Sequence, residues 1–322
     1  MANRLGPIKR YVRTELAESG GIAGYRGDAT EQLRRATALY VYSRLIDDFR
    51  ERPADMQRLV EMDRDAVVRA AVRHMVDRVA WAREVLEFEP EPLQIEPLQS
   101  WSRRIIFNCN RQFGKSTLCA IRALHRAWFW PGSLILLVSR AQPQSGGVAL
   151  KIREFLPSLG LTAQQVRGDG LHRISIRFPN GSRIVALPGG QKPTRSHSSV
   201  AMVIIDEAGM VPDPVHDAVA PTLARTDGEL ILASTPMGKR GAFYRTWLYG
   251  GESWLKVFGP VNELQPGKFS SKFLKEERTR GGEDYFAQEY LCEFVDRDSH
   301  LFGEDSIHAV FRKDVESWEA VK

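Results

Sequence analysis

At 322 residues the chain is long enough for one large α/β domain or two small ones, and its 43% hydrophobic and 26% charged composition is ordinary for a globular protein. No apolar run approaches the length needed to span a membrane, and the N-terminal sequence lacks the apolar core of a signal peptide. The net charge of +5, with an isoelectric point near 9.1, permits a polyanionic partner such as nucleic acid without demanding one.

The cysteines exclude two further classes of protein. Cys109, Cys119 and Cys292 are too few and too scattered for a disulfide framework or a zinc site. This usage favours a reducing, cytosolic setting.

The first 73 residues predict a small helical region. Glu31–Arg50 and Asp63–Glu87 carry apolar residues at helical spacing, with charged residues between them. Solvated helix faces explain these charges better than a DNA-binding arm does. The proline-punctuated FEPEPLQIEPLQ (88–99) then leads into the main domain.

From residue 104 short apolar runs alternate with helical patterns. The predicted strands are Arg104–Asn108, Leu134–Ser139, Arg173–Phe178, Ser182–Leu187, Val200–Asp206, Glu229–Ser234 and Leu255–Phe258. The predicted helices are Ser116–Trp130, Pro143–Leu156, Pro214–Ala224, Ala242–Tyr249 and Lys272–Arg280. Continuous apolar strands predict a parallel sheet covered on both faces, and Asn180-Gly181 between two alternating runs predicts a β-hairpin insertion.

Residues 108–117, NCNRQFGKST, have the form of a phosphate-binding loop except that Cys109 stands where the usual pattern has its first glycine. The loop follows a predicted strand and opens a predicted helix, whose N-terminus offers free N–H groups to an anion. Gly114 lets the backbone approach phosphate, Lys115 supplies a positive charge, and Ser116 is a candidate Mg²⁺ ligand.

The apolar strand VAMVIIDEA (200–208) ends in two acids. An NTPase needs a carboxylate at such a strand end to hold Mg²⁺, and we predict this role for Asp206. It also needs a base that orients the attacking water, and we predict this role for Glu207. Two acids ending a strand carry no function by themselves. After a phosphate loop they favour an NTPase.

The segment ELILASTPMGKRG (229–241) contains a third predicted buried strand, Glu229–Ser234. The strand ends in small hydroxyl residues, and a Pro-x-Gly turn follows it. In an α/β sheet its carboxyl end lies beside the other two motifs. Ser234 and Thr235 are therefore candidates to sense the γ-phosphate, although Ser-Thr-Pro alone indicates only a turn.

Together these motifs resemble the ATPase (motor) domain of the large terminase subunit of tailed bacteriophages, over about residues 74–311. The resemblance rests on NCNRQFGKST, PGSLILLVSRAQPQS, NGSRIVALPGG, TRSHSSVAMVIIDEA, LILASTPMGKRGAFYRTW and FAQEYLCEFVDRDSHLF. It implies a P-loop NTPase fold of the ASCE type, with a mostly parallel sheet flanked by helices. Family loops resemble R-Q-x-G-K-[ST] and often lack the first glycine, so Cys109 is a tolerated departure.

The resemblance also implies roles for residues that the pattern alone does not single out. Gln94 in PLQIEPL would read adenine, although a surface glutamine is the alternative. Arg111 would act on the γ-phosphate as an arginine finger, and Arg195 is a second candidate arginine, with action in cis or in trans left open. Ser234-Thr235 would couple hydrolysis to movement. The implied nucleotide-binding residues are Gln94, Arg111, Gln112, Phe113, Gly114, Lys115, Ser116 and Thr117.

The implied function is an ATP- and Mg²⁺-dependent motor that translocates double-stranded DNA into a procapsid in the host cytoplasm. Its partners would be double-stranded DNA, a portal protein, a small terminase subunit and further copies in a homo-oligomeric ring. The implied domains are a helical region (1–73), the ATPase domain (74–300) and a linker (301–322), with no nuclease activity expected from this chain. Two alternatives stay open: another P-loop DNA translocase or helicase, and a catalytically idle DNA- or capsid-binding remnant.

Overall fold

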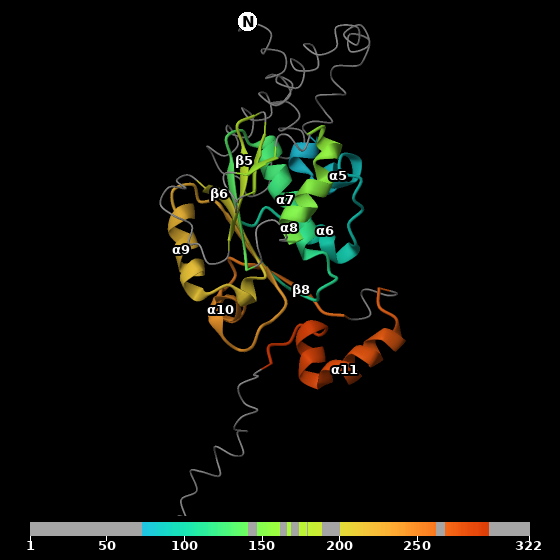
Figure 1. Cartoon of the computed structure of the whole chain (residues 1–322). Coiled ribbons are helices and arrows are strands. Elements are labelled where there is room, and N and C mark those ends of the chain that lie inside the picture. Colours follow the sequence, from blue (N-terminus) through green and yellow to red (C-terminus); the bar gives the residue numbers. More distant parts are fainter. Residues whose placement is uncertain are drawn as a thin grey trace, which may run out of the picture.

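A computed structural model describes residues 73–140, 147–161, 166–168, 174–178, 180–188, 200–261 and 268–295 of the chain. Its centre is one eight-stranded sheet with helices on both faces (Figure 1). The predicted helical region 1–73, apart from Arg73, and the predicted linker 301–322 lie outside the described residues.

The strand order is β3-β4-β5-β2-β6-β7-β1-β8. The strands are β1 (Arg104–Cys109), β2 (Leu134–Ser139), β3 (Val166–Gly168), β4 (Ile174–Arg177), β5 (Arg183–Pro188), β6 (Val200–Asp206), β7 (Glu229–Ser234) and β8 (Leu255–Gly259). All neighbours pair in parallel except β3 with β4 and β4 with β5. Strand β7 therefore separates β1, which precedes the phosphate loop, from β6, which carries the acidic pair.

Helices cover both faces of this sheet (Figure 1). One face carries α5 (Arg78–Glu84), α6 (Pro92–Gln99), α7 (Lys115–Phe129) and α8 (Gly147–Phe155); the other carries α9 (Asp213–Leu223) and α10 (Gly241–Tyr249). Helix α11 (Ser271–Glu289) lies beyond the end of β8. Short 3₁₀ turns η2 (Pro157–Leu159) and η4 (Ala208–Met210) follow α8 and β6.

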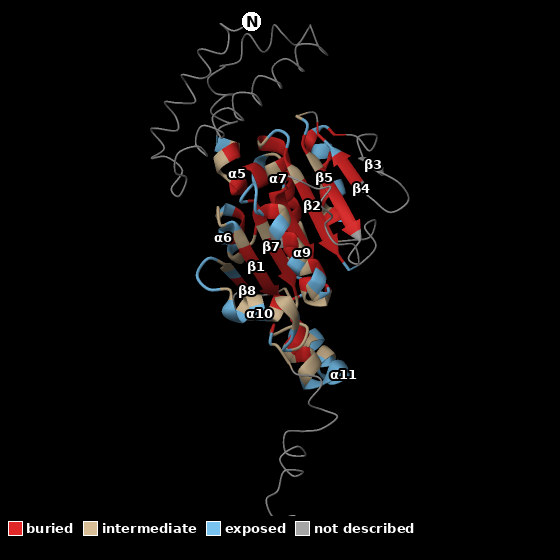
Figure 2. Ribbon diagram, turned by 90° about the vertical axis from the view of Figure 1, so that its left-hand side faces the viewer, coloured by how far each residue is buried: buried red, intermediate tan, exposed pale blue. Residues whose placement is uncertain are grey.

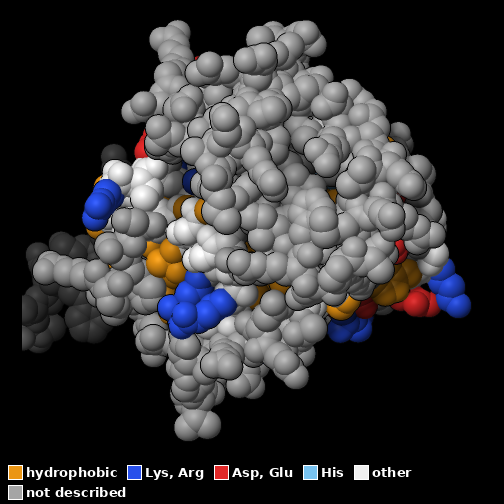
Figure 3. All heavy atoms as spheres, turned by 90° about the horizontal axis from the view of Figure 1, so that it is seen from above, with side chains coloured by type: hydrophobic (Ala, Val, Ile, Leu, Met, Phe, Trp, Pro, Cys, Tyr) orange, Lys and Arg blue, Asp and Glu red, His pale blue; other side chains and the backbone are white. Residues whose placement is uncertain are grey.

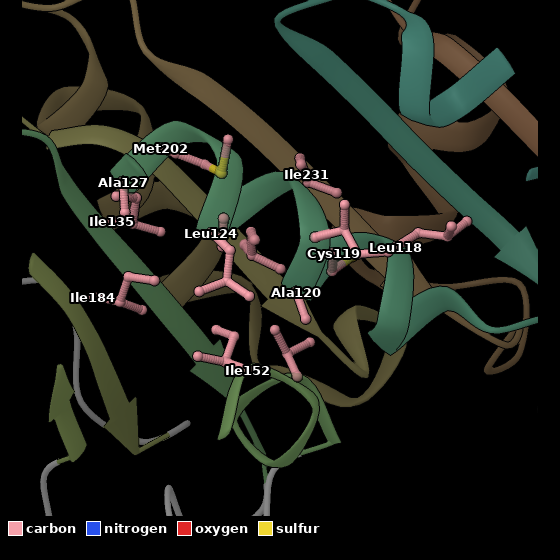
Figure 4. Close-up of a cluster of buried hydrophobic side chains, with 14 of the residues drawn as sticks. Leu118, Cys119, Ala120, Leu124, Ala127, Ile135, Ile152, Ile184, Met202 and Ile231 are labelled. Atoms are coloured by element: carbon pink, nitrogen blue, oxygen red, sulfur yellow. The ribbon is translucent and has the colours of Figure 1, made fainter. Parts of the chain in front are cut away.

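Successive side chains of the central strands alternate between two apolar cores, as the period of a strand requires. In β2, Ile135 and Leu137 face α7 and α8, while Leu136 and Val138 face α9. Figure 2 shows the resulting buried central strands, and Figure 4 the larger core, where side chains of α7 meet Ile135, Ile184, Met202, Ile231 and Ile152. A sheet buried on both faces explains why its strands read as continuous apolar runs.

The predicted hairpin is confirmed. Strands β4 and β5 pair antiparallel, and Gly181 has a φ of +82°, a conformation that glycine adopts without strain. The N–H of Gly181 donates to the Phe178 carbonyl, and that of Phe178 donates to the Ser182 carbonyl.

Two predicted elements were wrong in extent. Residues 92–99 are a helix rather than only a connection, because Pro92 takes the first helical position, where its missing N–H costs nothing, and Gln94 caps the Glu91 N–H. Helix α11 continues past the predicted Arg280 to Glu289, through a kink at Gly282. The short strand β3 had no sequence signal.

None of the described helices combines the length and the apolar character that a membrane span requires. Among the residues coloured in Figure 3, Lys and Arg side chains appear at separate points of that face, not as one continuous basic field.

Candidate functional site

The phosphate loop joins β1 to α7 and is shaped by its own hydrogen bonds. The N–H of Phe113 donates to the Asn110 carbonyl (3.3 Å), and the N–H of Gln112 donates to Asn110 Oδ1 (2.9 Å). Gly114 has a φ of +94° and caps α7, which begins at Lys115. The first turn of α7, with Ser116 and Thr117, therefore presents amide N–H groups that have no partner within the helix.

Lys115 lies inside the curve of this loop. Its side chain is only 9% exposed, and Nζ donates to the carbonyls of Cys109 (2.6 Å) and Asn110 (2.7 Å). Burial lowers the pKa of Lys115, against the neighbouring acidic groups that raise it. The ammonium group is thus held inside the loop by two backbone carbonyls, at the start of α7.

Cys109 and Phe113 form the floor of the loop, packed against Gly259 at the end of β8. A Cβ at Gly259 would lie 2.9 Å from Cys109 Sγ and 2.6 Å from Phe113 Cε2. Gly259 also accepts hydrogen bonds from the N–H and the side chain of Asn110. Cys109 takes the place of the usual first glycine of the loop, and its side chain needs room. Gly259 on the neighbouring strand β8 leaves that room because it has no Cβ.

Gln94 lies against the loop, so the alternative of a surface glutamine is excluded. It is 3% exposed, its Nε2 donates to the Phe113 carbonyl (2.6 Å), and its Oε1 accepts from the Glu91 N–H (3.0 Å). These bonds occupy one donor and one acceptor position of the amide. The adenine-reading role stays a prediction.

The acidic pair lies at the end of β6, across β7 from the loop, because Asp206 pairs with Ala233 of β7 and Asn108 of β1 pairs with Ser234. Asp206 is 7% exposed, and burial together with the Glu207 carboxylate raises its pKa to about 6. The N–H of Glu207 donates to Asp206 Oδ1 (3.2 Å), and the N–H of Val148 donates to the same carboxylate.

Glu207 is exposed and has a left-handed backbone (φ +53°, ψ +39°), an uncommon state for a non-glycine residue that costs on the order of 1–2 kcal/mol. The turn separates the two carboxylates, so that one is buried and the other reaches solvent. An exposed carboxylate can be reached by a water molecule, which a general base requires.

Ser116 and Asp206 converge at the start of α8. A Cβ at Gly147 would lie 2.9 Å from Ser116 Oγ and 3.4 Å from Asp206 Oδ2. A hydroxyl and a carboxylate oxygen facing one small space fit Mg²⁺, which takes oxygen ligands and is commonly held by few protein groups together with phosphates. No cluster of three His, Cys, Asp or Glu residues able to hold a metal occurs within the described ranges.

The end of β7 contacts the turn after the acidic pair. Ser234 is buried, and its Oγ accepts from the Gly209 N–H (3.1 Å), while Thr235 follows at the half-buried edge. A Cβ at Gly209 would lie 3.0 Å from Ser234 Oγ. A change in the Glu207 turn can therefore reach the Ser234-Thr235 segment directly.

The arginine candidates have different positions. Arg111 stands on the outer lip of the loop, and its Nε donates to Glu289 Oε2 of α11 (2.6 Å). Arg195 lies outside the described residues. Gln112 is exposed beside Arg111.

The structure thus brings together Gln94, Arg111–Thr117, Asp206, Glu207, Ser234 and Thr235 at the carboxyl ends of the strands. The sequence reasoning missed four neighbours: Gly147, Gly209, Gly259 and Glu289. The three glycines have no local motif. The resemblance included FAQEYLCEF, the segment of Glu289, but gave that residue no role.

Comparisons with known proteins identify the family of this chain. A family model, the N-terminal part of the T4likevirus-type terminase large subunit, matches residues 106–309, more than half of the chain. The large terminase subunits of Thermus virus P23-45 and Thermus phage G20c are each 26% identical over 254 residues, 68% of this chain and 51% of each relative. The chain spans about half the length of these curated relatives.

Solved structures show the same fold. The large terminase ATPase domain of Thermus phage P74-26 matches with a TM-score of 0.54 and 22% identity, covering 66% of this chain and 97% of that chain. The HK97 bacteriophage large terminase gives 0.54 and 16% identity, over 68% and 55%. The large terminase of a thermophilic bacteriophage, in complex with ADP, gives 0.50 and 14%, over 64% and 54%. The chain therefore has the P-loop NTPase fold of large terminase ATPase domains, and it belongs to the terminase large subunit family, of which it matches the N-terminal part.

Proposed function

We propose that this chain is the ATP-hydrolysing motor part of a large terminase subunit, which moves double-stranded viral DNA into a procapsid. The observation that carries the proposal is the convergence of Ser116 Oγ and Asp206 Oδ2 at Gly147, beside Lys115 and the start of α7. This arrangement suits a nucleoside triphosphate with its Mg²⁺. A protein of the same fold, the large terminase of a thermophilic bacteriophage, has been solved in complex with ADP.

We assign roles in hydrolysis to the following residues of the site. Lys115 and the amides of Gly114–Thr117 bind the β- and γ-phosphates. Ser116 and Asp206 would hold Mg²⁺, which would neutralise phosphate charge. Glu207 orients a water molecule toward the γ-phosphorus and accepts its proton, as the bond to the bridging oxygen of ADP breaks. Arg111 offers positive charge to the γ-phosphate.

Movement of DNA requires that hydrolysis change the shape of the protein. The bond between the Gly209 N–H and Ser234 Oγ links the turn after Glu207 to the Ser234-Thr235 segment, so a change at one is passed to the other. The further partners that we propose are those of a packaging motor: a portal protein, a small terminase subunit and other copies of the chain in a ring.

Steady-state ATP hydrolysis tests the proposal. Wild-type protein is compared with Glu207→Gln, with and without linear duplex DNA and with Mg²⁺ or EDTA. We expect Glu207→Gln to lose at least about 100-fold in kcat, the usual contribution of a general base, while nucleotide binding is retained. Glu252→Gln, a change at an exposed carboxylate of the α10–β8 turn, is the matched control and should turn over as wild type does.

The outcomes separate the alternatives. Turnover that survives Glu207→Gln would contradict the assignment of the base. Failure of the wild-type chain to bind ATP would favour an idle remnant. Unwinding of a forked duplex by the chain alone would favour a helicase.

A further inference from the structure

The C-terminal end of α11 is fixed to the outer side of the phosphate loop. The N–H of Val261, just after β8, donates to the Tyr290 carbonyl (2.7 Å), and Asn108 Nδ2 of β1 donates to the Cys292 carbonyl (2.9 Å). Figure 2 shows that most of α11 is exposed, with buried residues among the last turns. The buried residues of the helix therefore lie at this end, beside the nucleotide site.

Glu289, the last residue of α11, is a carboxylate that the fold has placed out of water. Its side chain is 5% exposed; Oε2 accepts from Arg111 Nε (2.6 Å) and Oε1 from Gln288 Nε2 (3.1 Å). In the described part of the chain, Arg111 is its only ion-pair partner. A buried carboxylate is costly unless it is paired, so this contact differs from an incidental surface ion pair.

Arg111 is held in a particular way. Its side chain is 67% exposed, and the contact to Glu289 uses Nε. No described residue accepts a hydrogen bond from its two terminal nitrogens. Those nitrogens carry four of the five N–H donors of a guanidinium, in the planar arrangement that matches a phosphate.

We propose that Glu289 is a positioning residue for the hydrolysis of ATP. It anchors Arg111 through Nε on the lip of the loop, so that the terminal nitrogens are presented to the phosphates without a search through rotamers. The inference rests on the proposed function, since it assigns Arg111 a partner in that reaction. It joins α11 to the chemistry through a single side chain.

The test is a double-mutant cycle on kcat and KM for ATP in the full chain. We expect Glu289→Ala to lower kcat about tenfold, the effect of losing one charge-assisted hydrogen bond, with a smaller rise in KM. Glu289→Gln should retain most of the activity, because its amide oxygen still accepts from Nε. Arg111→Ala should lose about 100-fold or more, as removal of an arginine finger does. Glu289→Ala should cost nothing further in the Arg111→Ala background.

Thermal unfolding of the same variants separates positioning from mere stability. Arg111→Ala leaves Glu289 buried and unpaired, so its melting temperature should fall, whereas Glu289→Ala leaves an arginine that water can solvate. The double variant should therefore recover the stability lost in Arg111→Ala without recovering its turnover. Glu293→Ala, a change at an exposed carboxylate in the same segment, is the control.

Two results would overturn the inference: Glu289→Ala turning over as fast as wild type, or a double variant slower than Arg111→Ala by the full effect of the second change. Absence of Glu207-dependent turnover in wild type would instead defeat the proposed function. In that case ATP affinity decides, because Glu289→Ala should weaken it only when Arg111 is present. Equal affinity in wild type and Glu289→Ala would then reject the positioning role.

Discussion

Cys109 shows how a single position in a phosphate loop depends on a distant one. Its thiol is fully buried, burial raises its pKa well above the ordinary value, and Sγ lies against β8, near the Val257 carbonyl (3.4 Å). A neutral, inert side chain can occupy this place because Gly259 has no Cβ. The loop conformation is thus supported by two residues that lie far apart in the sequence.

Gly259→Ala should therefore disturb the loop. The added Cβ would overlap the Phe113 ring, and overpacking of this kind costs about 1–3 kcal/mol in unfolding free energy. We expect a lower melting temperature and weaker ATP binding, measured by calorimetry. Gly259→Ala combined with Phe113→Leu, which shortens the opposing side chain, should recover part of both; wild-type affinity in the single variant would refute this account.

At the residue scale, sequence reasoning located the site residues that belong to short, continuous motifs. Gly114, Lys115 and Ser116 follow one another after a strand, and Asp206 ends an apolar run, so local patterns were enough to locate them. Gly147, Gly259 and Glu289 gain their roles from contacts across the fold. The sequence does not distinguish a glycine that leaves room for a neighbour, or a glutamate that is buried, from other glycines and glutamates. Only the positions of the neighbouring side chains show these roles.

Among the elements, α5, α6, α7 and β7 are joined by a buried group of charges at the amino ends of the strands. Arg122, fully buried on α7, donates to Glu229 Oε2 of β7 (2.7 Å) and to the carbonyls of Pro97 (2.8 Å) and Ser100 (2.8 Å) at the end of α6. Arg78 of α5 lies over the Trp101 ring at 3.9 Å. Burial raises the pKa of Glu229, but the surrounding arginines outweigh it and lower the pKa overall.

Glu229→Gln should be strongly destabilising. The amide keeps the shape of the side chain but removes the negative charge that Arg122 faces, and breaking a buried pair typically costs about 3–5 kcal/mol. Glu154→Gln, in the exposed pair with Lys151, should cost less than about 1 kcal/mol. Urea unfolding of both variants checks this, and equal losses would mean that burial of the pair is unimportant.

Prediction of elements succeeded where hydrophobic period and burial agree. Strands β2, β6 and β7 were predicted to the residue, because each is a buried run with clear ends. The helix at 92–99 was missed because its two prolines read as breaks, although Pro92 begins the helix and Pro97 lies within it. The full length of α11 was missed because Gly281-Gly282 interrupts its pattern.

In the whole molecule, the candidate site and the buried group of charges lie at opposite ends of the sheet. The carboxyl ends of β1, β6 and β7 carry the loop, the acidic pair and Ser234, while the amino ends of β1 and β7 carry the buried charges around Arg122. The sequence indicated the first end through its motifs. It offered no sign of the second, because Arg122 and Glu229 are 107 positions apart and read as surface charges.

The unfolding free energy of the whole fold should decrease as the pH is lowered, because of His125. This residue lies near the buried charges at the amino ends of the strands. The His125 ring is fully buried among the rings of Trp81, Phe129 and Trp130. Burial is the main cause that holds its pKa well below 6.5, and the positive charges of Arg78, Arg122 and Arg126 lower it further. The hydrogen bond to the His74 carbonyl has the opposite effect, which is smaller than that of burial. Folded His125 stays neutral while unfolded His125 binds a proton below about pH 6.5. The unfolded state then binds more protons, so the unfolding free energy decreases as pH falls, by up to about 1.4 kcal/mol per pH unit.

His125→Phe should remove this dependence, because phenylalanine keeps the aromatic contacts and binds no proton. The measurement is the unfolding free energy of both proteins in urea between pH 7.5 and about pH 5. His216, whose pKa burial also lowers, is present in both, so the difference between the two slopes isolates His125. Parallel curves would show that His125 gains its proton without unfolding. A wild-type curve that falls more steeply below about pH 6.5 would establish that His125, near the amino ends of the strands, contributes to the loss of stability in acid.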